Sequence, residues 1–341
     1  MTPQTISIRD HASGASAEIL VSQGFNCFRF TAMPAGQPVE VLYAPPDFAS
    51  GQSRPSRGGI PLMFPFPGRI PGTTFTWEGE QYTLEAGDAL GNAIHGFAMW
   101  RPWRIIDQAD NRLSGQFHAW RDDPSLKNRW PADFRLTAVY TLTANTLHAQ
   151  YSIENPGDTP LPCGFGTHPY FRVPLGDATP LGGRKADDCL VRLPVSARWE
   201  LKDMLPTGRR LDLPDAEKYQ AGQRYGDLTL DDVFTGLQSG TGILPVSGQG
   251  HAGPATKGIP ADDWCESSIH DPASGRTIMQ RFDRTFRECV VYTPPHREAI
   301  CIEPLTCMPN SFELTRQGID AGLRILDPGG SFTARVEISV S

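Results

Sequence analysis

Four short segments carry the side chains best suited to proton transfer or ligand binding, each set among glycine, proline and aromatic residues. They are Arg69 within 58–70, His95 within 92–100, His168 within 164–171 and Glu303 within 301–312. A loop of this composition can present one polar group in a partly apolar pocket. The four segments together therefore predict a binding site that contains an acid and a base.

An imidazole and a carboxylate can exchange protons at neutral pH. The ordinary pKa of histidine is near ~6.5, and a carboxylate that starts near ~4.3 becomes a better base when burial raises its pKa. Glu303 stands among Ile300, Ile302 and Leu305, where a carboxylate is either paired or has a raised pKa. The alternatives are structural: His168 could be hydrogen-bonded by backbone groups, and Glu303 could pair with an arginine.

A metal centre is disfavoured by the spacing of its possible ligands. His95, His168 and Glu303 could form a site of two histidines and one carboxylate, but neither histidine belongs to a local pattern such as HxH or HExxH. The seven cysteines are odd in number and lack CxxC spacing, which favours reduced, buried thiols over disulfides or a zinc site. We therefore expect no metal ligands.

The elements that must position these groups are predicted to be β-strands. Apolar and polar residues alternate through 134–142 and 147–153, and similar segments recur between turn sequences such as NPGD and DPGG. Sustained helical periodicity is almost absent. The 34 glycines and 31 prolines suit many strands joined by turns. We predict an all-β protein, a large antiparallel β-sandwich that forms one domain over residues 1–341.

One segment departs from the strand pattern. Residues 239–263 are rich in glycine, proline and serine and contain few large apolar side chains, so they can bury little surface. We expect a flexible inserted loop there, and we expect His251 within it to be solvated.

Charge and hydropathy exclude several classes of partner. The net charge is −7, and the 31 lysines and arginines are scattered, so the basic stripe of a nucleic-acid-binding protein is missing. No apolar run approaches the ~20 residues of a membrane span, and the N-terminus lacks the pattern of a secretion signal. A cytoplasmic protein that binds neither nucleic acid nor membrane is the expectation.

Several motifs, taken in order, resemble the aldose 1-epimerase (galactose mutarotase) family. They are NAIHGFAMWRPW, GTHPYF, LDDVF and CIEPLTCMPNSF, and GGIPLMFPFPGRI is similar to the family's early substrate-binding segment. The resemblance spans the chain from about residue 15 to the C-terminus. It implies a galactose mutarotase-like β-sandwich, a sugar-handling role in the cytoplasm and no cofactor.

The resemblance also implies roles for individual residues. Glu303 is similar in position to the family's general base and His168 to its general acid. His95 resembles the second histidine, which contacts the sugar near its ring oxygen. These three are the expected catalytic residues.

Substrate-binding roles follow in the same way. Arg69 resembles the arginine that hydrogen-bonds sugar hydroxyls, and the family's aspartate falls on LDDVF, where Asp231 fits the spacing better and Asp232 stays open. Aromatic residues such as Phe66 and Tyr170 could cover the apolar face of the ring. Taken singly, each aromatic residue is a better candidate for the core than for sugar binding.

The activity expected from this resemblance is interconversion of the α and β anomers of a free hexose, such as galactose or glucose, by acid/base ring opening. One alternative is a hexose-6-phosphate mutarotase. Its relatives tend to carry an arginine soon after HGFA, where this chain has Met99, although Arg101 keeps that option open. The other alternative is a non-catalytic carbohydrate-binding β-sandwich, because fold does not fix function. In each case the partner is a small sugar.

Overall fold

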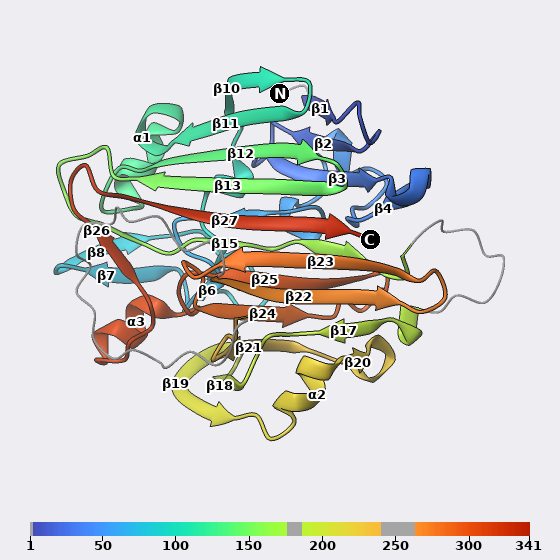
Figure 1. Ribbon diagram of the computed structural model, residues 1–341. Helices are drawn as coiled ribbons and strands as arrows, with labels where there is room; N and C mark the ends of the chain where they lie inside the picture. Colours follow the sequence, from blue (N-terminus) through green and yellow to red (C-terminus); the bar gives the residue numbers. More distant parts are fainter. Residues whose placement is uncertain (1–2, 176–185, 240–262) are drawn as a thin grey trace.

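The chain folds into two large antiparallel sheets, as shown by a computed structural model that describes residues 3–175, 186–239 and 263–341 (Figure 1). The predicted all-β antiparallel sandwich is confirmed. The inserted loop expected at 239–263, including His251, lies outside the described residues except for its two end positions. Within the described ranges, no helix is long and apolar enough to cross a membrane.

The larger sheet has nine strands. In spatial order they are β10 (Arg104–Ala109), β11 (Arg112–His118), β12 (Arg135–Thr143), β13 (Thr146–Glu154), β27 (Ser331–Val340), β23 (Arg276–Asp283), β22 (Trp264–Asp271), β17 (Leu190–Arg192) and β20 (Gln223–Arg224). The C-terminal strand β27 runs through the middle of this sheet, between β13 and β23 (Figure 1). The alternating segments at 134–142 and 147–153 correspond to β12 and β13, as predicted.

The second sheet has eight strands and carries the candidate site. In order they are β19 (Leu205–Asp212), β18 (Ala197–Lys202), β21 (Asp231–Thr235), β24 (Glu288–Tyr292), β25 (Ala299–Leu305), β15 (Gly166–Thr167) and β5 (Leu62–Met63), with β16 (Tyr170–Arg172) also paired to β25. Here β25 is central, because it contacts β24 on one side and both β15 and β16 on the other. Segments distant in sequence therefore meet around β25.

Smaller elements complete the fold. Strands β1 (Thr5–Arg9), β2 (Ser16–Leu20), β3 (Asn26–Ala32) and β4 (Val39–Glu40) form a third sheet, and two-stranded pairs join β6 (Arg69–Ile70) to β9 (Ala93–Ile94), β7 (Thr74–Trp77) to β8 (Glu80–Thr83), and β14 (Leu161–Cys163) to β26 (Arg324–Leu326). The α-helices are short: α1 (Ala119–Asp122), α2 (Ala216–Ala221) and α3 (Ser311–Arg316).

A common apolar core joins the two large sheets. Strands β12 and β13 bury every second side chain, as their alternating sequences require, and these residues belong to the same buried cluster as Ile300 and Ile302 of β25. All seven cysteines are buried and free, as expected from their spacing. The assignment of residues 1–341 to one domain stays a prediction, which this common core favours.

Candidate active site

Strand β25 presents an acidic side chain on the face of its sheet that is turned away from the core. All seven residues of the strand are buried. Since successive side chains point to opposite faces, Ile300 and Ile302 enter the core while Cys301 and Glu303 point the other way. The sequence places Glu303 in an apolar strand. The alternation of side chains along β25, together with its pairing register, turns the carboxylate of Glu303 toward the site.

The neighbouring strands extend this outer face. Glu303 lies opposite Val290 of β24, and Val290 lies opposite Val233 of β21. Asp231 shares the face of Val233, two residues along the strand, whereas Asp232 points to the other face. The alternation of β21 thus brings Asp231 to the site.

His168 is held between β15 and β16 and faces Glu303. Its backbone N–H donates to the carbonyl oxygen of Pro61 (3.0 Å), and its ring stacks on Tyr170 with the centroids 4.9 Å apart and the planes 8° apart. The Nε2 atom of His168 lies 3.1 Å from Oε1 of Glu303. Only 6% of His168 and 3% of Glu303 is exposed, so this acid/base pair is almost shielded from water.

His95 follows β9 in a left-handed backbone conformation, with φ +65°. The backbone N–H of Gly68 donates to its Nδ1 atom (3.2 Å), so the hydrogen of a neutral ring is on Nε2. The next residue must be glycine, because a Cβ at Gly96 would lie 2.2 Å from the carbonyl oxygen of Phe64. The ring of His95 meets that of His168 edge to face, with centroids 5.5 Å apart.

Arg69, in β6, is fixed by an acidic side chain that sequence reasoning did not identify. Its Nε donates to Oδ2 of Asp88 (2.8 Å), and Oδ1 of Asp88 accepts the backbone N–H groups of Leu90 (2.9 Å) and Asn92 (2.8 Å). Asp88 is therefore anchored in its own turn while it orients the guanidinium. The only sequence signal was a carboxylate in the turn shortly before His95.

These side chains surround a cavity of about 180 Å³. Arg69, His95, His168, Asp231 and Glu303 all line it. Drug-sized ligands occupy pockets of roughly 300 to 1,000 Å³, so this volume suits a monosaccharide better than a larger molecule. Mostly apolar residues that were not expected from the sequence complete the wall: Ile94, Leu201, Met204, Val233, Val290 and Tyr292.

Desolvation changes the acidity of three titratable groups at the cavity, the buried Glu303 and His168 and the half-buried His95. It raises the pKa of Glu303 well above its usual value; the charge of Asp231 adds to this rise and Arg69 opposes it. Burial also lowers the pKa of His168 to about 4 and that of His95 well below its ordinary value. These shifts favour the neutral forms of both histidines and the protonated form of Glu303.

Two residues expected to bind the sugar lie behind the cavity wall. Phe66 is 3% exposed and stacks on Trp130 in the core, with ring centroids 5.6 Å apart. Tyr170 backs the ring of His168, and its hydroxyl donates to the carbonyl oxygen of Ser56 (2.7 Å). Neither residue lines the cavity.

Asp232 also lies away from the cavity. Its Oδ1 atom is 3.4 Å from Nη1 of Arg198, and its side chain belongs to the opposite face of β21 from Asp231. The structure brings five of the eight expected site residues to one cavity and leaves Phe66, Tyr170 and Asp232 outside it.

Among the residues that the structure describes, one group of side chains could hold a metal ion. The possible ligand atoms of His168, Cys301 and Glu303 all lie within 4.8 Å of one another, and all three residues are buried. Cys301 is on the same face of β25 as Glu303 but does not line the cavity. Sequence spacing could not reveal this group, because Cys301 and His168 meet only through strand pairing.

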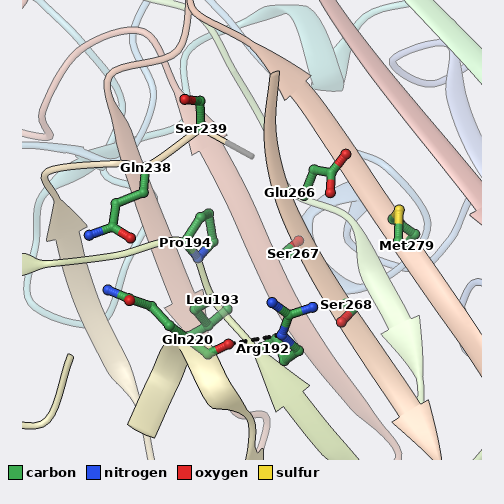
Figure 2. Close-up of a pocket in the computed structure, with 10 residues that line it drawn as sticks. All are labelled: Arg192, Leu193, Pro194, Gln220, Gln238, Ser239, Glu266, Ser267, Ser268 and Met279. Carbon is green, nitrogen blue, oxygen red and sulfur yellow. Dashed lines mark hydrogen bonds between the residues drawn. The ribbon is translucent and has the colours of Figure 1, made fainter. Parts of the chain in front are cut away.

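A second, larger cavity of about 230 Å³ lies elsewhere, beside β17 and β22 (Figure 2). Its polar groups are largely engaged: Nε of Arg192 donates to the carbonyl oxygen of Gln220 (2.8 Å), and Oγ of Ser267 donates to Gln280 (3.0 Å). Its charged residues, Arg192 and Glu266, are exposed to solvent. No buried acid/base pair is present among the residues that line it.

Comparison with known proteins shows the family to which the chain is similar. The model of the family described as aldose 1-epimerase matches residues 31–339. The uncharacterized protein YihR of Escherichia coli K12 is 23% identical over 272 residues, which cover 79% of this chain and 74% of YihR. Two solved structures are similar in fold.

The first of them is a galactose mutarotase-like protein from Clostridium acetobutylicum, with 19% identity and a TM-score of 0.80 over 100% of this chain and 99% of that one. The second is a GalM/aldose epimerase homologue from C. elegans, with 17% identity and a TM-score of 0.74 over 99% of each chain. At these identities the two likenesses show the fold.

Proposed function

Because the chain belongs to the aldose 1-epimerase family, whose model matches residues 31–339, we propose that it interconverts the α and β anomers of a free hexose such as galactose or glucose. The observation that carries this proposal is the buried pair of His168 Nε2 and Glu303 Oε1, 3.1 Å apart at a monosaccharide-sized cavity. Ring opening of a hemiacetal requires one acid and one base that can both reach the anomeric centre.

The proposed reaction begins from the arrangement in which the one proton shared by the pair is on His168 and Glu303 is ionised; the two pKa shifts favour the opposite arrangement in the free enzyme, so the reactive arrangement is the minor one before the sugar binds. The carboxylate of Glu303 removes the proton of the anomeric hydroxyl, and the oxygen of that hydroxyl forms the C=O bond of the aldehyde. The C1–O5 bond breaks, and its electron pair on O5 takes the proton of His168. After rotation about C1–C2, the reverse steps close the ring on the other face of the aldehyde. The pair holds one proton in the free enzyme and regains that state after each turnover.

The two groups contact each other directly before the sugar binds. For catalysis, the anomeric hydroxyl must reach Glu303 and the ring oxygen must reach His168, so the sugar oxygens replace the contact between the two side chains. Burial helps here, because a carboxylate with a raised pKa is a stronger base and an imidazolium with a lowered pKa is a stronger acid. Each group then contributes roughly 10² to 10⁴ in rate.

The remaining cavity residues hold the sugar. Neutral His95 donates a hydrogen bond from Nε2 toward the ring oxygen region, while Arg69 and Asp231 bind hydroxyl groups. Arg69 is oriented by Asp88 before any ligand arrives, which reduces the entropy lost on binding. The reaction uses only the side chains of this chain and a small sugar, and the free buried thiols fit the reducing cytoplasm as its location.

Polarimetry tests the proposal. Freshly dissolved α-D-glucose or α-D-galactose should reach its equilibrium rotation faster with the protein than in buffer, in proportion to protein concentration. A preparation inactivated by heat serves as the control. Unchanged rates with both sugars would contradict the free-hexose assignment.

A sugar phosphate is the second candidate, and a pair of arginines near the site favours it. Arg54 and Arg57 are exposed, and neither forms an ion pair with any carboxylate in the described part of the chain. The charge of Arg54 contributes to the lowered pKa of His95, and that of Arg57 opposes the raised pKa of Tyr292, so both lie near the cavity. Arg101 is engaged elsewhere, with Nε 2.6 Å from Oδ2 of Asp123.

Kinetics separate the candidates. A sugar-phosphate mutarotase should act on glucose 6-phosphate with a lower KM than on glucose, and Arg54→Ala together with Arg57→Ala should remove that advantage. The third possibility, a non-catalytic carbohydrate-binding protein, predicts sugar binding by calorimetry without any acceleration of anomer exchange.

A further inference from the structure

Directly beside the acid/base pair stands a thiol that the proposed reaction does not use. Cys301 lies two residues before Glu303 on the same face of β25 and directly opposite Tyr170, whose ring stacks on His168. One face of a single strand, β25, therefore supplies a sulfur and a carboxylate, and the adjoining loop supplies an imidazole.

The donor atoms of these three side chains have the spacing of a metal site. They all lie within 4.8 Å of one another, and the His168–Glu303 pair is already at 3.1 Å. In a tetrahedral zinc site, with bonds of about 2.0 to 2.3 Å, ligand atoms are roughly 3.3 to 3.6 Å apart. Small side-chain rotations would be enough to reach that geometry.

We propose that His168, Cys301 and Glu303 form a binding site for a zinc ion, which acts as an inhibitor of the proposed reaction and not as its cofactor. A nitrogen, a sulfur and a carboxylate oxygen together match zinc, whereas magnesium and calcium prefer oxygen ligands alone. On binding, the thiol of Cys301 gives one proton to solvent and the His168–Glu303 pair gives another, and the fourth position of the metal faces the cavity, open to water.

The partners of the groups around the site leave its donor atoms available. Arg69, whose guanidinium lines the cavity, is already paired with Asp88. Within the described residues, the imidazole of His168 contacts Glu303 through one nitrogen only, and its Nδ1 atom is buried without a partner. A metal would therefore replace a single polar contact.

Inhibition follows from the atoms that the metal occupies. Zinc bound by Glu303 and His168 takes the lone pairs that accept protons during ring opening and closing, so the pair can no longer act as base and acid. This effect on rate rests on the proposed function, whereas the binding of zinc does not.

Calorimetry tests the binding itself. The protein is first stripped of metal with a chelator, and the chelator is then removed. Zinc chloride should bind with a stoichiometry of one, and magnesium chloride should give no binding. Cys301→Ser should weaken zinc binding by at least tenfold and leave the rate of anomer exchange without zinc within about twofold of the original. Cys289→Ser is the matched control, because that thiol is on the adjacent strand β24 but enters the core, and it should bind zinc as the original protein does.

Each outcome decides the proposal. Absence of stoichiometric zinc binding, or equal binding by the original protein and Cys301→Ser, would overturn it. Anomalous diffraction at the zinc edge gives a test that needs no variant: the peak should lie at bonding distance from all three side chains, and a peak elsewhere would refute the site. If zinc binds there but no anomer exchange occurs even without metal, the proposed function fails and the zinc site stands.

Discussion

Two cavities among the described residues differ in chemistry more than in size. The larger one, of about 230 Å³, is lined by exposed charged residues and by polar groups that already have partners (Figure 2). The smaller one, of about 180 Å³, contains a buried imidazole and a buried carboxylate in direct contact. The two cavities are of similar size, so their chemistry is what distinguishes them.

The contrast between the two cavities shows which features distinguish a cavity suited to catalysis from one that is not. Burying a carboxylate without a full set of hydrogen bonds costs free energy, so a buried carboxylate that faces a cavity beside a buried imidazole is a candidate for a function. Glu303 lies in this situation, whereas Glu266 in the larger cavity is exposed and pairs with Arg281 (3.0 Å). The predictions below test this contrast, from the largest effect to the smallest.

The largest effect is expected from removing the acid or the base. Glu303→Gln and His168→Asn should each lower kcat for anomer exchange by about 10² to 10⁴, because each removes a proton-transfer group while keeping the shape of the side chain. Glu266→Gln, in the larger cavity, is the matched control and should leave kcat unchanged. Polarimetry measures all three, and an inactive Glu266→Gln with an active Glu303→Gln would reverse the assignment of the two cavities.

A second buried carboxylate should affect stability and not catalysis. Glu288 lies on the outer face of β24, 1% exposed, and accepts a hydrogen bond from Nε1 of Trp199 (2.9 Å). Burial raises the pKa of Glu288 to about 7. Its pKa is higher in the folded than in the unfolded chain, so the folded state binds the proton more tightly, and the free energy of unfolding should fall as pH rises from about 4.5 to about 7.

The fall caused by Glu288 should amount to about 3 kcal/mol at the most. In Glu288→Gln it should vanish, since an amide does not titrate, and this variant should be more stable than the original protein at pH 8 but not at pH 4. Chemical denaturation at a series of pH values measures the difference. Parallel stability curves for the two proteins would show that Glu288 does not hold its proton as the structure indicates.

Neighbouring aspartates on opposite faces of β21 should behave differently. Asp231→Asn should raise KM by about tenfold or more, with a small change in kcat, because it removes a charged hydrogen-bond partner of the sugar. Asp232→Asn changes the same functional group outside the cavity and should leave KM unaltered. Initial rates over a range of sugar concentrations check both, and equal effects of the two substitutions would mean that the face of β21 does not determine binding.

The smallest effect is expected from the residue that positions Arg69. Asp88→Asn keeps an acceptor for the turn but loses the charge opposite the guanidinium, a partly exposed pair worth roughly 1 kcal/mol or less. We expect KM to rise about threefold to fivefold with kcat within about twofold, and Asp88→Glu to restore part of the loss. A fall in kcat alone would assign Asp88 a role in the chemistry.

Much of the fold could be predicted from the sequence, because the pattern that indicates a strand lies within the residues of that strand. Alternation through β12 and β13 is visible in the residues themselves, and the absence of helical periodicity excludes the other fold classes. The candidate residues Glu303 and His168 were also evident as polar groups in stiff, apolar segments. The family resemblance supplied their expected roles, which the structure leaves as proposals.

The rest depended on which strands pair, which no local pattern encodes. The choice between Asp231 and Asp232 required the register of β21 against β24, since a shift of one residue reverses the face of every side chain. Phe66 looked as suitable for sugar binding as any aromatic residue until its stacking on Trp130 placed it in the core. Asp88 was missed because the sequence does not show that its turn folds back onto Arg69, 19 residues earlier.

Exchange spectroscopy by NMR tests the central claim most directly. With a free hexose at equilibrium, cross-peaks between the anomeric protons of the α and β forms report the interconversion itself, although the amounts of the two anomers do not change. We predict strong cross-peaks with the original protein and their loss with Glu303→Gln. Cross-peaks no stronger than those of the sugar alone, in a sample where the sugar demonstrably binds, would contradict the account.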